Sequence, residues 1–294
     1  MRTAEPNFIV RLMRPEEVEL IRTWSTAEGW NPGLHDGPCF FDGPCFFAID
    51  PEGFFIGELG GRPVSCISCV AYDDSFGFLG HYLVKPEFRG QGYGVHTWRA
   101  GMAHLGARNV GLDAVLAQQS NDERSGFTFA HHHIRYQGEG GGRSPTGVIR
   151  LADVPFEDVL AYDRGCFPAP RPTFLRNWLT LPESVALGCL RDGRLAGFGV
   201  ARRGAEGFKI GPLFADDLPA AEVLLRGLTV ETAGRPSCLD IPDDVANPAA
   251  GQLARRFGMR EVSRTARMYT QGRPRLDAGR IFGITSMELV VCHS

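Results

Sequence analysis

The segment Val84–Val95 constrains the fold of this chain most strongly, because it joins a strand to a helix through a glycine-rich turn. Its letters are V-K-P-E-F-R-G-Q-G-Y-G-V. The residues before it, Phe76–Val84, are mostly aromatic and aliphatic, as in a buried strand, and apolar residues after it recur at helical spacing as far as Leu105. A turn of this kind directs free backbone N–H groups and the positive end of a helix dipole toward one point. That point suits a phosphate or pyrophosphate.

Comparison with known phosphate-binding motifs narrows the ligand. A G-x-G-x-x-G register starting at Gly90 would end on Val95, and the Gly-Lys pair of a P-loop occurs nowhere in the chain. The segment does fit Arg-x-x-Gly-x-Gly, which resembles the acyl-CoA-binding motif of the GNAT family of N-acetyltransferases. The resemblance implies acetyl-CoA as the acyl-donor cosubstrate. It also implies that the pyrophosphate is bound by Arg89, Gly90, Gln91, Gly92, Tyr93, Gly94 and Val95.

Hydrophobic periodicity predicts the order β-α-β-β-β-α-β-α-β over about residues 7 to 137, which is similar to the GNAT core. A glycine-rich polar run at 139–147 reads as a flexible linker, and a comparable order of elements begins again after it. We therefore predict an α/β (α+β) fold with two GNAT-type lobes in tandem, each a mixed sheet flanked by helices. The predicted lobes are 1–138, which would be catalytic, and 148–294.

The second half lacks the glycine-rich turn. At the corresponding place it has Gly211–Asp217, in which Pro212 removes an amide donor and Asp216 and Asp217 would repel a pyrophosphate. We expect only the first half to bind the cofactor, and the degenerate second half to shape the acceptor site.

The family resemblance also suggests catalytic residues. It implies main-chain contacts from Leu83 and Val84 to the pantetheine arm, and a further contact from Asn121. Many relatives place a tyrosine acid four residues before a Gly-Phe pair, but here that position is Asp122. A desolvated Asp122, a phenol such as Tyr82, Tyr93 or Tyr136, or solvent could instead protonate the thiolate. His81, on the strand that leads into the turn, is a candidate base, although a packed or surface histidine is the commoner explanation of such a residue.

The loop before the second predicted strand supplies candidate acceptor-side residues. Glu28 and Asp36 could act as acids and Trp30 as a wall, and each also fits an ordinary loop residue. The hexapeptide D-G-P-C-F-F occurs twice in direct succession, at 36–41 and 42–47. We interpret it as a short duplication in a surface loop that could form a lid or wall over an acceptor.

Composition bounds the remaining possibilities. The net charge is −3 with a calculated pI near 6.3 and no basic cluster, which argues against nucleic acid as a primary partner. The N-terminus lacks a signal pattern and no apolar run is long enough for a membrane span, so we expect a soluble cytoplasmic protein.

Neither the cysteines nor a histidine triplet predicts a metal site. Cys66 and Cys69 lie in an alternating strand-like run, where residues three apart face opposite sides. The same alternation separates the rings of His131–His133, which we read as part of a partly exposed strand. We therefore predict buried free thiols and no metal.

The sequence thus predicts an acetyl-CoA-dependent N-acetyltransferase in which a primary amine attacks the thioester directly. A catalytically inactive acyl-CoA sensor is the alternative, and a different acyl group would change only the donor. The expected acceptor is a small-molecule or peptide amine, whose identity the sequence does not specify, and a homodimer is a possible assembly.

Overall fold

The computed structural model describes residues 7–30, 45–286 and 290–291. The first half of the chain forms one mixed set of strands and helices. In chain order these are β1 (Phe8–Leu12), α1 (Val18–Ala27), β2 (Phe54–Leu59), β3 (Arg62–Ala71), β4 (Phe76–Val84), α3 (Tyr93–Leu105), β5 (Asn109–Val115), α4 (Gln119–Arg124) and β6 (Thr128–Glu139).

The second half repeats this arrangement and adds a C-terminal segment. Its elements are β7 (Val148–Arg150), α5 (Phe156–Cys166), α6 (Pro172–Trp178), β8 (Ser184–Arg191), β9 (Arg194–Arg203), β10 (Phe208–Ala215), α7 (Leu218–Glu231), β11 (Pro236–Pro242), α8 (Pro248–Arg256), β12 (Arg260–Tyr269), β13 (Ile281–Gly283) and β14 (Val290–Val291). The predicted α/β class is confirmed. Helix α6 was not predicted, because its seven residues are too few to show a helical period.

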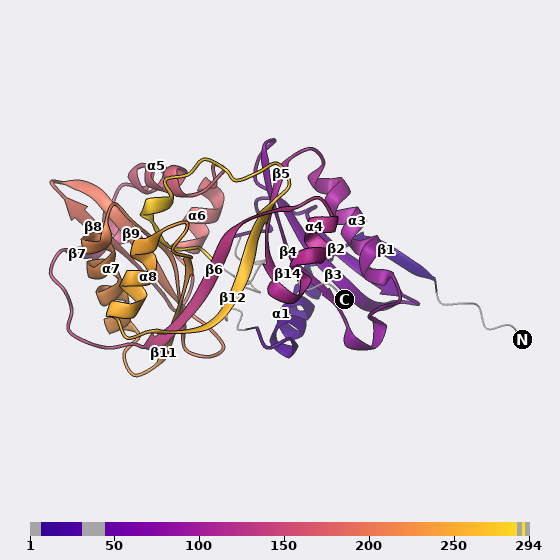
Figure 1. Cartoon of the computed structure of the whole chain (residues 1–294), viewed down its shortest axis with the longest axis horizontal. Coiled ribbons are helices and arrows are strands. Elements are labelled where there is room, and N and C mark those ends of the chain that lie inside the picture. The colour runs from indigo at the N-terminus through magenta and orange to yellow at the C-terminus, as the bar shows by residue number, and fades with distance from the viewer. Residues whose placement is uncertain (1–6, 31–44, 287–289, 292–294) are drawn as a thin grey trace, which may run out of the picture.

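The two halves share one continuous sheet, because each contributes one strand to the other. The strand order is β1-β2-β3-β4-β14-β5-β12-β6-β11-β10-β9-β8-β7. Strand β12, from the second half, pairs with β5 of the first half, and β6, from the first half, pairs with β11 of the second. The two exchanged strands also pair with each other and run side by side between the halves (Figure 1). The mixed sheets predicted for the two lobes are thus joined into one.

The exchange changes the predicted linker. Glu139 belongs to β6 and pairs with Pro236, and Gly140 forms a bridge with Ala233. Only 141–147 lies between strands, because the end of the exchanged strand needs backbone partners from the second half.

None of the described helices is long and apolar enough to cross a membrane.

A buried ion pair attaches each exchanged strand to its host half. In the first half, Arg267 of β12 donates to both carboxylate oxygens of Asp113, directly opposite it on β5, at 3.0 and 2.6 Å. In the second half, Arg135 of β6 makes the same bidentate contact to Asp240 of β11, with both distances 2.7 Å. Such pairs fix strand register, because a slip of one residue would leave two buried charges without partners.

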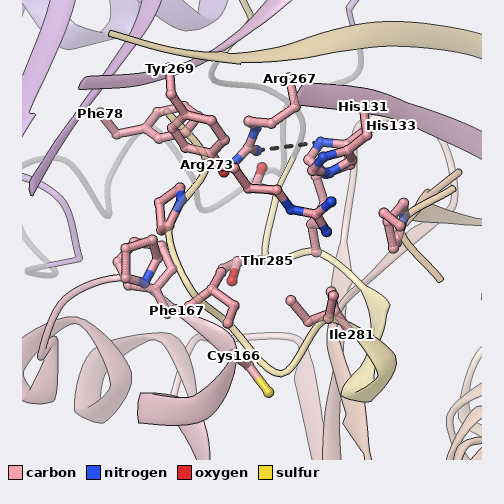
Figure 2. Close-up of a pocket in the computed structure, with 18 of the residues that line it drawn as sticks. Phe78, His131, His133, Cys166, Phe167, Arg267, Tyr269, Arg273, Ile281 and Thr285 are labelled. Atoms are coloured by element: carbon pink, nitrogen blue, oxygen red, sulfur yellow. Dashed lines mark hydrogen bonds between the residues drawn. The ribbon is translucent and has the colours of Figure 1, made fainter. Parts of the chain in front are cut away.

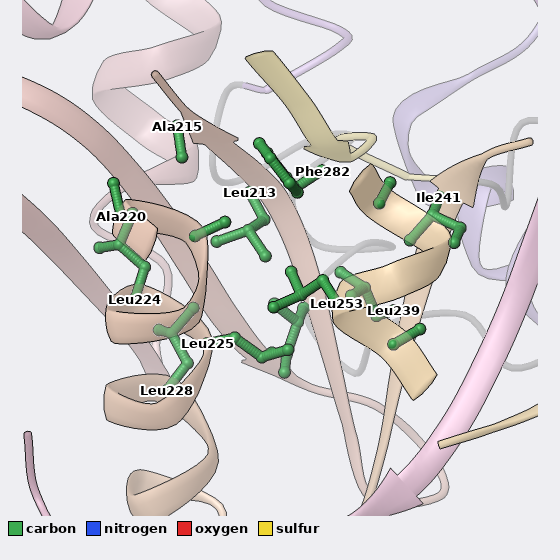
Figure 3. Packing of buried hydrophobic residues seen from close by; sticks show 14 of the residues in the cluster. Leu213, Ala215, Ala220, Leu224, Leu225, Leu228, Leu239, Ile241, Leu253 and Phe282 are labelled. Atoms are coloured by element: carbon green, nitrogen blue, oxygen red, sulfur yellow. The ribbon is translucent and has the colours of Figure 1, made fainter. Parts of the chain in front are cut away.

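The core of the second half lies between its sheet and the helices α7 and α8. Leu224 and Leu228 of α7 and Leu253 of α8 are fully buried against β10 and β11 (Figure 3). Phe282 of β13 lies in the same cluster and is 1 % exposed. The short β13 is therefore an integral part of this core.

The exchange depends on buried charge pairing, and this can be tested at Asp113. We expect Asp113→Asn to lower the free energy of unfolding by about 3–5 kcal/mol, because it leaves the buried Arg267 without a counter-charge. Urea unfolding measures this change. Glu261→Gln is the matched control, since Glu261 pairs with Arg264 on the same strand β12 but the two side chains are 38 and 40 % exposed. The control should cost less than about 1 kcal/mol. Equal effects of the two variants would contradict the argument.

Candidate functional site

The glycine-rich turn forms as predicted between β4 and α3. Gly90 has a φ of +71° and Gly92, the N-cap of α3, a φ of +85°. These left-handed conformations disfavour other residues. A Cβ atom added at either position would meet no atom within 4 Å, so the space above the turn is open. The turn therefore presents backbone N–H groups at the start of a helix of 13 residues to an accessible surface.

Arg89 of this turn is held by two local contacts. Its Nε donates to the Val84 carbonyl oxygen at 3.0 Å, and its guanidinium forms an ion pair with Glu28, just after α1. Glu28, a candidate acceptor-side acid, therefore lies beside the turn predicted to bind phosphate. Gln91 donates from its side chain to the Glu87 carbonyl oxygen at 3.0 Å.

Tyr82 and Asp122 come together on the α3 side of β4. The Tyr82 ring packs on Trp98, with 5.3 Å between centroids, and its hydroxyl lies close to Gly94, where a Cβ atom would collide with it. Burial, with a smaller contribution from Asp122, raises the pKa of Tyr82. Asp122 is completely buried at the end of α4. Asn121 instead uses its side chain within its own helix, where it contacts Gln118 and Arg124.

His81 lies at a bulge of β4 rather than in regular strand. Its φ is +45°, and the register with β3 shifts there, between the Cys66–Leu83 and Ser68–Gly80 pairs. The buried His81 ring is 6.5 Å from the Trp30 ring. Asp36, the third residue predicted on the acceptor side, lies outside the described residues, as does most of the duplicated hexapeptide.

The remaining predicted cofactor residues lie around the same turn. Leu83 and Val84 are buried at the end of β4, whereas Val95 is 49 % exposed on α3. Tyr93 is the first residue of α3, and its ring packs against that of Phe8 with 4.9 Å between the centroids.

A groove opens next to the turn, between β4 and β5. These strands pair in parallel from Phe76 to Phe78 and then separate. The C-terminal strand β14 lies in the gap, with Val291 opposite Tyr82 on one side and Ala114 on the other. The backbone of β4 at this point can therefore pair with an added extended segment.

The second half has a corresponding gap between β10 and β11, and β13 fills it. Pairing of β10 with β11 ends at Ile210, and β13 then pairs antiparallel with β10. The two acidic residues of the turn have structural partners. Asp217 accepts from the Ala220 amide at the start of α7 and pairs with Arg191, while Asp216 pairs with Arg280.

A cavity that is partly open to solvent lies where the two halves meet. Its floor is the sheet from β4 to β6, and its opposite wall comes from the end of α5, the connection 167–171 that follows it and the segment 273–286 (Figure 2). Six of the described aromatic side chains line the cavity, namely Phe46, Tyr72, Phe78, Phe167, Phe214 and Tyr269. Among the described residues that line it, the charged side chains are those of Arg171, Arg267 and Arg273.

A chain of hydrogen bonds runs from Asp113 toward this cavity through two histidines. Asp113 contacts His133 Nδ1 at 2.8 Å, and the Nε2 atoms of His133 and His131 are 3.1 Å apart. Both imidazoles are buried, and both lie on the face of β6 opposite to that of His132. The described residues contain no group of three or more side chains that could hold a metal ion. Strand β6 is partly exposed, as predicted, and His131 and His133 lie on its buried face. Their spacing of two residues is the signal that would have indicated a shared face.

Burial and neighbouring charges shift the pKa values of Asp113, His133 and His131, the three residues of this hydrogen-bond chain. Burial alone would raise the pKa of Asp113, but Arg267 and His133 more than offset it and hold that pKa below its ordinary value. Burial lowers the pKa of His133, and burial together with His133 and Arg267 lowers the pKa of His131 to about 2. Both imidazoles are therefore neutral near pH 7.

The described cysteines are buried and free. Burial raises the pKa of Cys66 and of Cys166, which lines the cavity, to about 12. A thiol with such a pKa is a poor nucleophile at neutral pH, because it holds almost no thiolate.

Comparison with known proteins identifies the family. The chain matches the acetyltransferase (GNAT) family at residues 17–130 and an acetyltransferase (GNAT) domain at residues 159–283. The protein belongs to the GNAT family of acyltransferases and carries two GNAT domains in tandem. It is 28 % identical over 277 residues to a holothin acyltransferase from Pseudoalteromonas sp. (strain SANK 73390). The aligned region covers 93 % of this chain and 92 % of that protein.

Solved structures share the fold. An acetyltransferase structure from Pyrococcus horikoshii superposes with a TM-score of 0.81 at 21 % identity, covering 96 % of this chain and 95 % of that one. A tandem GNAT protein from the clavulanic acid biosynthesis pathway gives a TM-score of 0.58 at 16 % identity, with coverage of 90 and 98 %. The predicted tandem arrangement of two GNAT-type domains is therefore confirmed.

Proposed function

We propose that this enzyme transfers an acetyl group from acetyl-CoA to a primary amine, and that the turn Arg89–Val95 binds the pyrophosphate. The observation that carries the proposal is the open space above Gly90 and Gly92 at the start of α3. Backbone N–H groups there can approach phosphate oxygens without obstruction from side chains. The pyrophosphate would replace Glu28 as the partner of Arg89.

The proposed reaction is a direct transfer. The lone pair of a neutral amine attacks the thioester carbonyl carbon, a C–N bond forms, and the C–S bond then breaks to release CoA as a thiol. The amine loses one proton and the CoA sulfur gains one. The high pKa of the cavity thiol Cys166 supports this direct route over a covalent cysteine intermediate.

The donor would bind with its pantetheine arm along β4 in the groove that opens beyond Phe78. Strand β14 pairs at this point with Tyr82. The arm and β14 would therefore compete for the same backbone groups. In the second half β13 carries the buried Phe282, so displacing it would expose core. This difference supports a single donor site, in the first half.

Calorimetric titration with acetyl-CoA tests the site. We expect Gly92→Asp to weaken binding at least tenfold, because the added carboxylate would repel the pyrophosphate and the side chain strains a left-handed backbone by about 1–2 kcal/mol. Gly193→Asp is the matched control, since Gly193 also has a positive φ (+74°) and open space but lies in a hairpin of the second half. Absence of binding by the folded wild type would overturn the proposal.

Truncation tests the competition. A chain ending at Ser286 lacks β14, and we expect it to bind acetyl-CoA about threefold to tenfold more tightly than the full chain, because no segment must leave the groove first. A chain ending at Val291 keeps β14 and should bind like the full chain. Equal or weaker binding by the shorter chain would contradict competition for this groove.

A further inference from the structure

The cavity floor connects the proposed donor groove to the two buried histidines. Phe78, Gly111 and Tyr269 lie opposite one another on β4, β5 and β12. The next row along the sheet carries Asp113, Arg267 and His131 on β5, β12 and β6. A molecule lying on this floor could therefore reach from the edge of the groove at β4 and β5 to His131.

The cavity walls favour a flat, uncharged molecule. Aromatic rings of Tyr72, Phe78, Phe167 and Tyr269 line it, and none of the described residues that line it is acidic. An ammonium group would find no counter-charge there and would face arginines instead. Two of these arginines are neutralised, Arg267 by Asp113 and Arg171 by Asp163.

Arg273 is the cavity's third arginine. It forms no ion pair with a residue that the structure describes, and Figure 2 shows its side chain extending toward the two imidazoles. Its guanidinium can therefore donate to a carbonyl oxygen of a bound molecule.

The hydrogen-bond chain determines which ring nitrogen of His131 carries the proton and which can accept a hydrogen bond. Ionised Asp113 can only accept, so His133 donates to it from Nδ1 and accepts at Nε2. Arg267 also approaches His133 Nδ1, at 3.4 Å (dashed line in Figure 2), but the shorter, charge-assisted contact to Asp113 decides the tautomer. His131 must then donate from Nε2, which leaves the lone pair on its Nδ1.

That Nδ1 atom is buried and has no hydrogen-bond partner among the described residues. His131 itself is 7 % exposed and lines the cavity. Buried polar atoms without partners are uncommon, and one that belongs to a residue lining a cavity can accept a hydrogen bond from a molecule that enters the cavity. The needed donor is an N–H or O–H group.

The spacing of the strands shows whether His131 could act as the base or only recognise the acceptor. His131 is two strands away from β5, at about 4.8 Å per strand, and hence about 10 Å from the edge of the groove. A base at that distance cannot take a proton directly from an amine at the thioester.

We propose that this cavity is the acceptor pocket, that it selects a flat aromatic amine that is neutral at pH 7, and that His131 Nδ1 accepts a hydrogen bond from a donor group at the far end of that acceptor. This proposal rests on the proposed function. Polyamines and other polycations are excluded. His131 is thus a specificity-determining residue, and Asp113 and His133 are positioning residues.

Three probe amines test the pocket in a thiol-release assay with acetyl-CoA. 4-Aminobenzamide carries an aromatic amine and an amide N–H donor, methyl 4-aminobenzoate keeps the ring and carbonyl but lacks that donor, and spermidine is a polycation. We expect 4-aminobenzamide to have a KM about tenfold lower than the ester, the usual effect of one buried hydrogen bond. Spermidine should give no amine-dependent thiol release.

Two histidine variants assign the preference to the pocket. His131→Phe keeps an aromatic ring but removes the acceptor nitrogen, so it should abolish the preference for the amide while changing kcat less than about threefold. His132→Gln is the matched control, because His132 lies on the other face of β6 beside Asp243, and it should keep the preference.

Several results would overturn the proposal. These are turnover of spermidine, equal KM values for the two aromatic amines in the wild type, a preference that survives in His131→Phe, or a large loss of kcat in that variant at unchanged KM. Calorimetry with each probe and with acetyl-CoA separates the two proposals. Binding of acetyl-CoA without binding of either aromatic amine refutes only the acceptor pocket. Binding of 4-aminobenzamide that depends on His131, without binding of acetyl-CoA, refutes only the donor site.

Discussion

Two buried arginine–aspartate pairs between directly opposed strands support the rest of this structure. Arg267–Asp113 and Arg135–Asp240 each attach an exchanged strand to the other half. Because a buried charge without its partner is costly, the pairs oppose any slip of β12 or β6. The exchange makes one sheet from two GNAT domains, and the floor of the cavity is the part of that sheet where strands of both halves alternate.

The same pair connects fold to site chemistry. Asp113 accepts from Arg267 and from His133, so the carboxylate that holds β12 in register also fixes the tautomers of both buried histidines. A structural ion pair thereby leaves the lone pair of His131 on Nδ1, in a residue that lines the cavity. A change at Asp113 would affect stability and recognition together, whereas a change at His131 would affect recognition alone.

The C-terminal segment distinguishes the two halves. It fills the gap between β10 and β11 with β13, whose Phe282 is part of the core, and it then reaches the gap between β4 and β5 with the two residues of β14. The first gap is closed by packing, whereas the second is closed by a short stretch of backbone pairing. This asymmetry agrees with the acidic turn at Asp216 and Asp217, whose side chains are engaged in caps and ion pairs where the first half has its open glycine turn.

The sequence by itself determined the features that depend on neighbouring residues. The glycine turn before α3, the periodicity of most strands and helices and the acidic replacement turn are local, and each was predicted within a few residues. The strand exchange, the filling of both gaps and the burial of His131 and His133 depend on contacts between residues far apart in the sequence, such as Asp113 and Arg267. Alternation along β6 could show that His131 and His133 share a face, but not which face is covered. That was decided only by the tertiary structure, because burial of a strand depends on the elements packed against it and not on its own sequence.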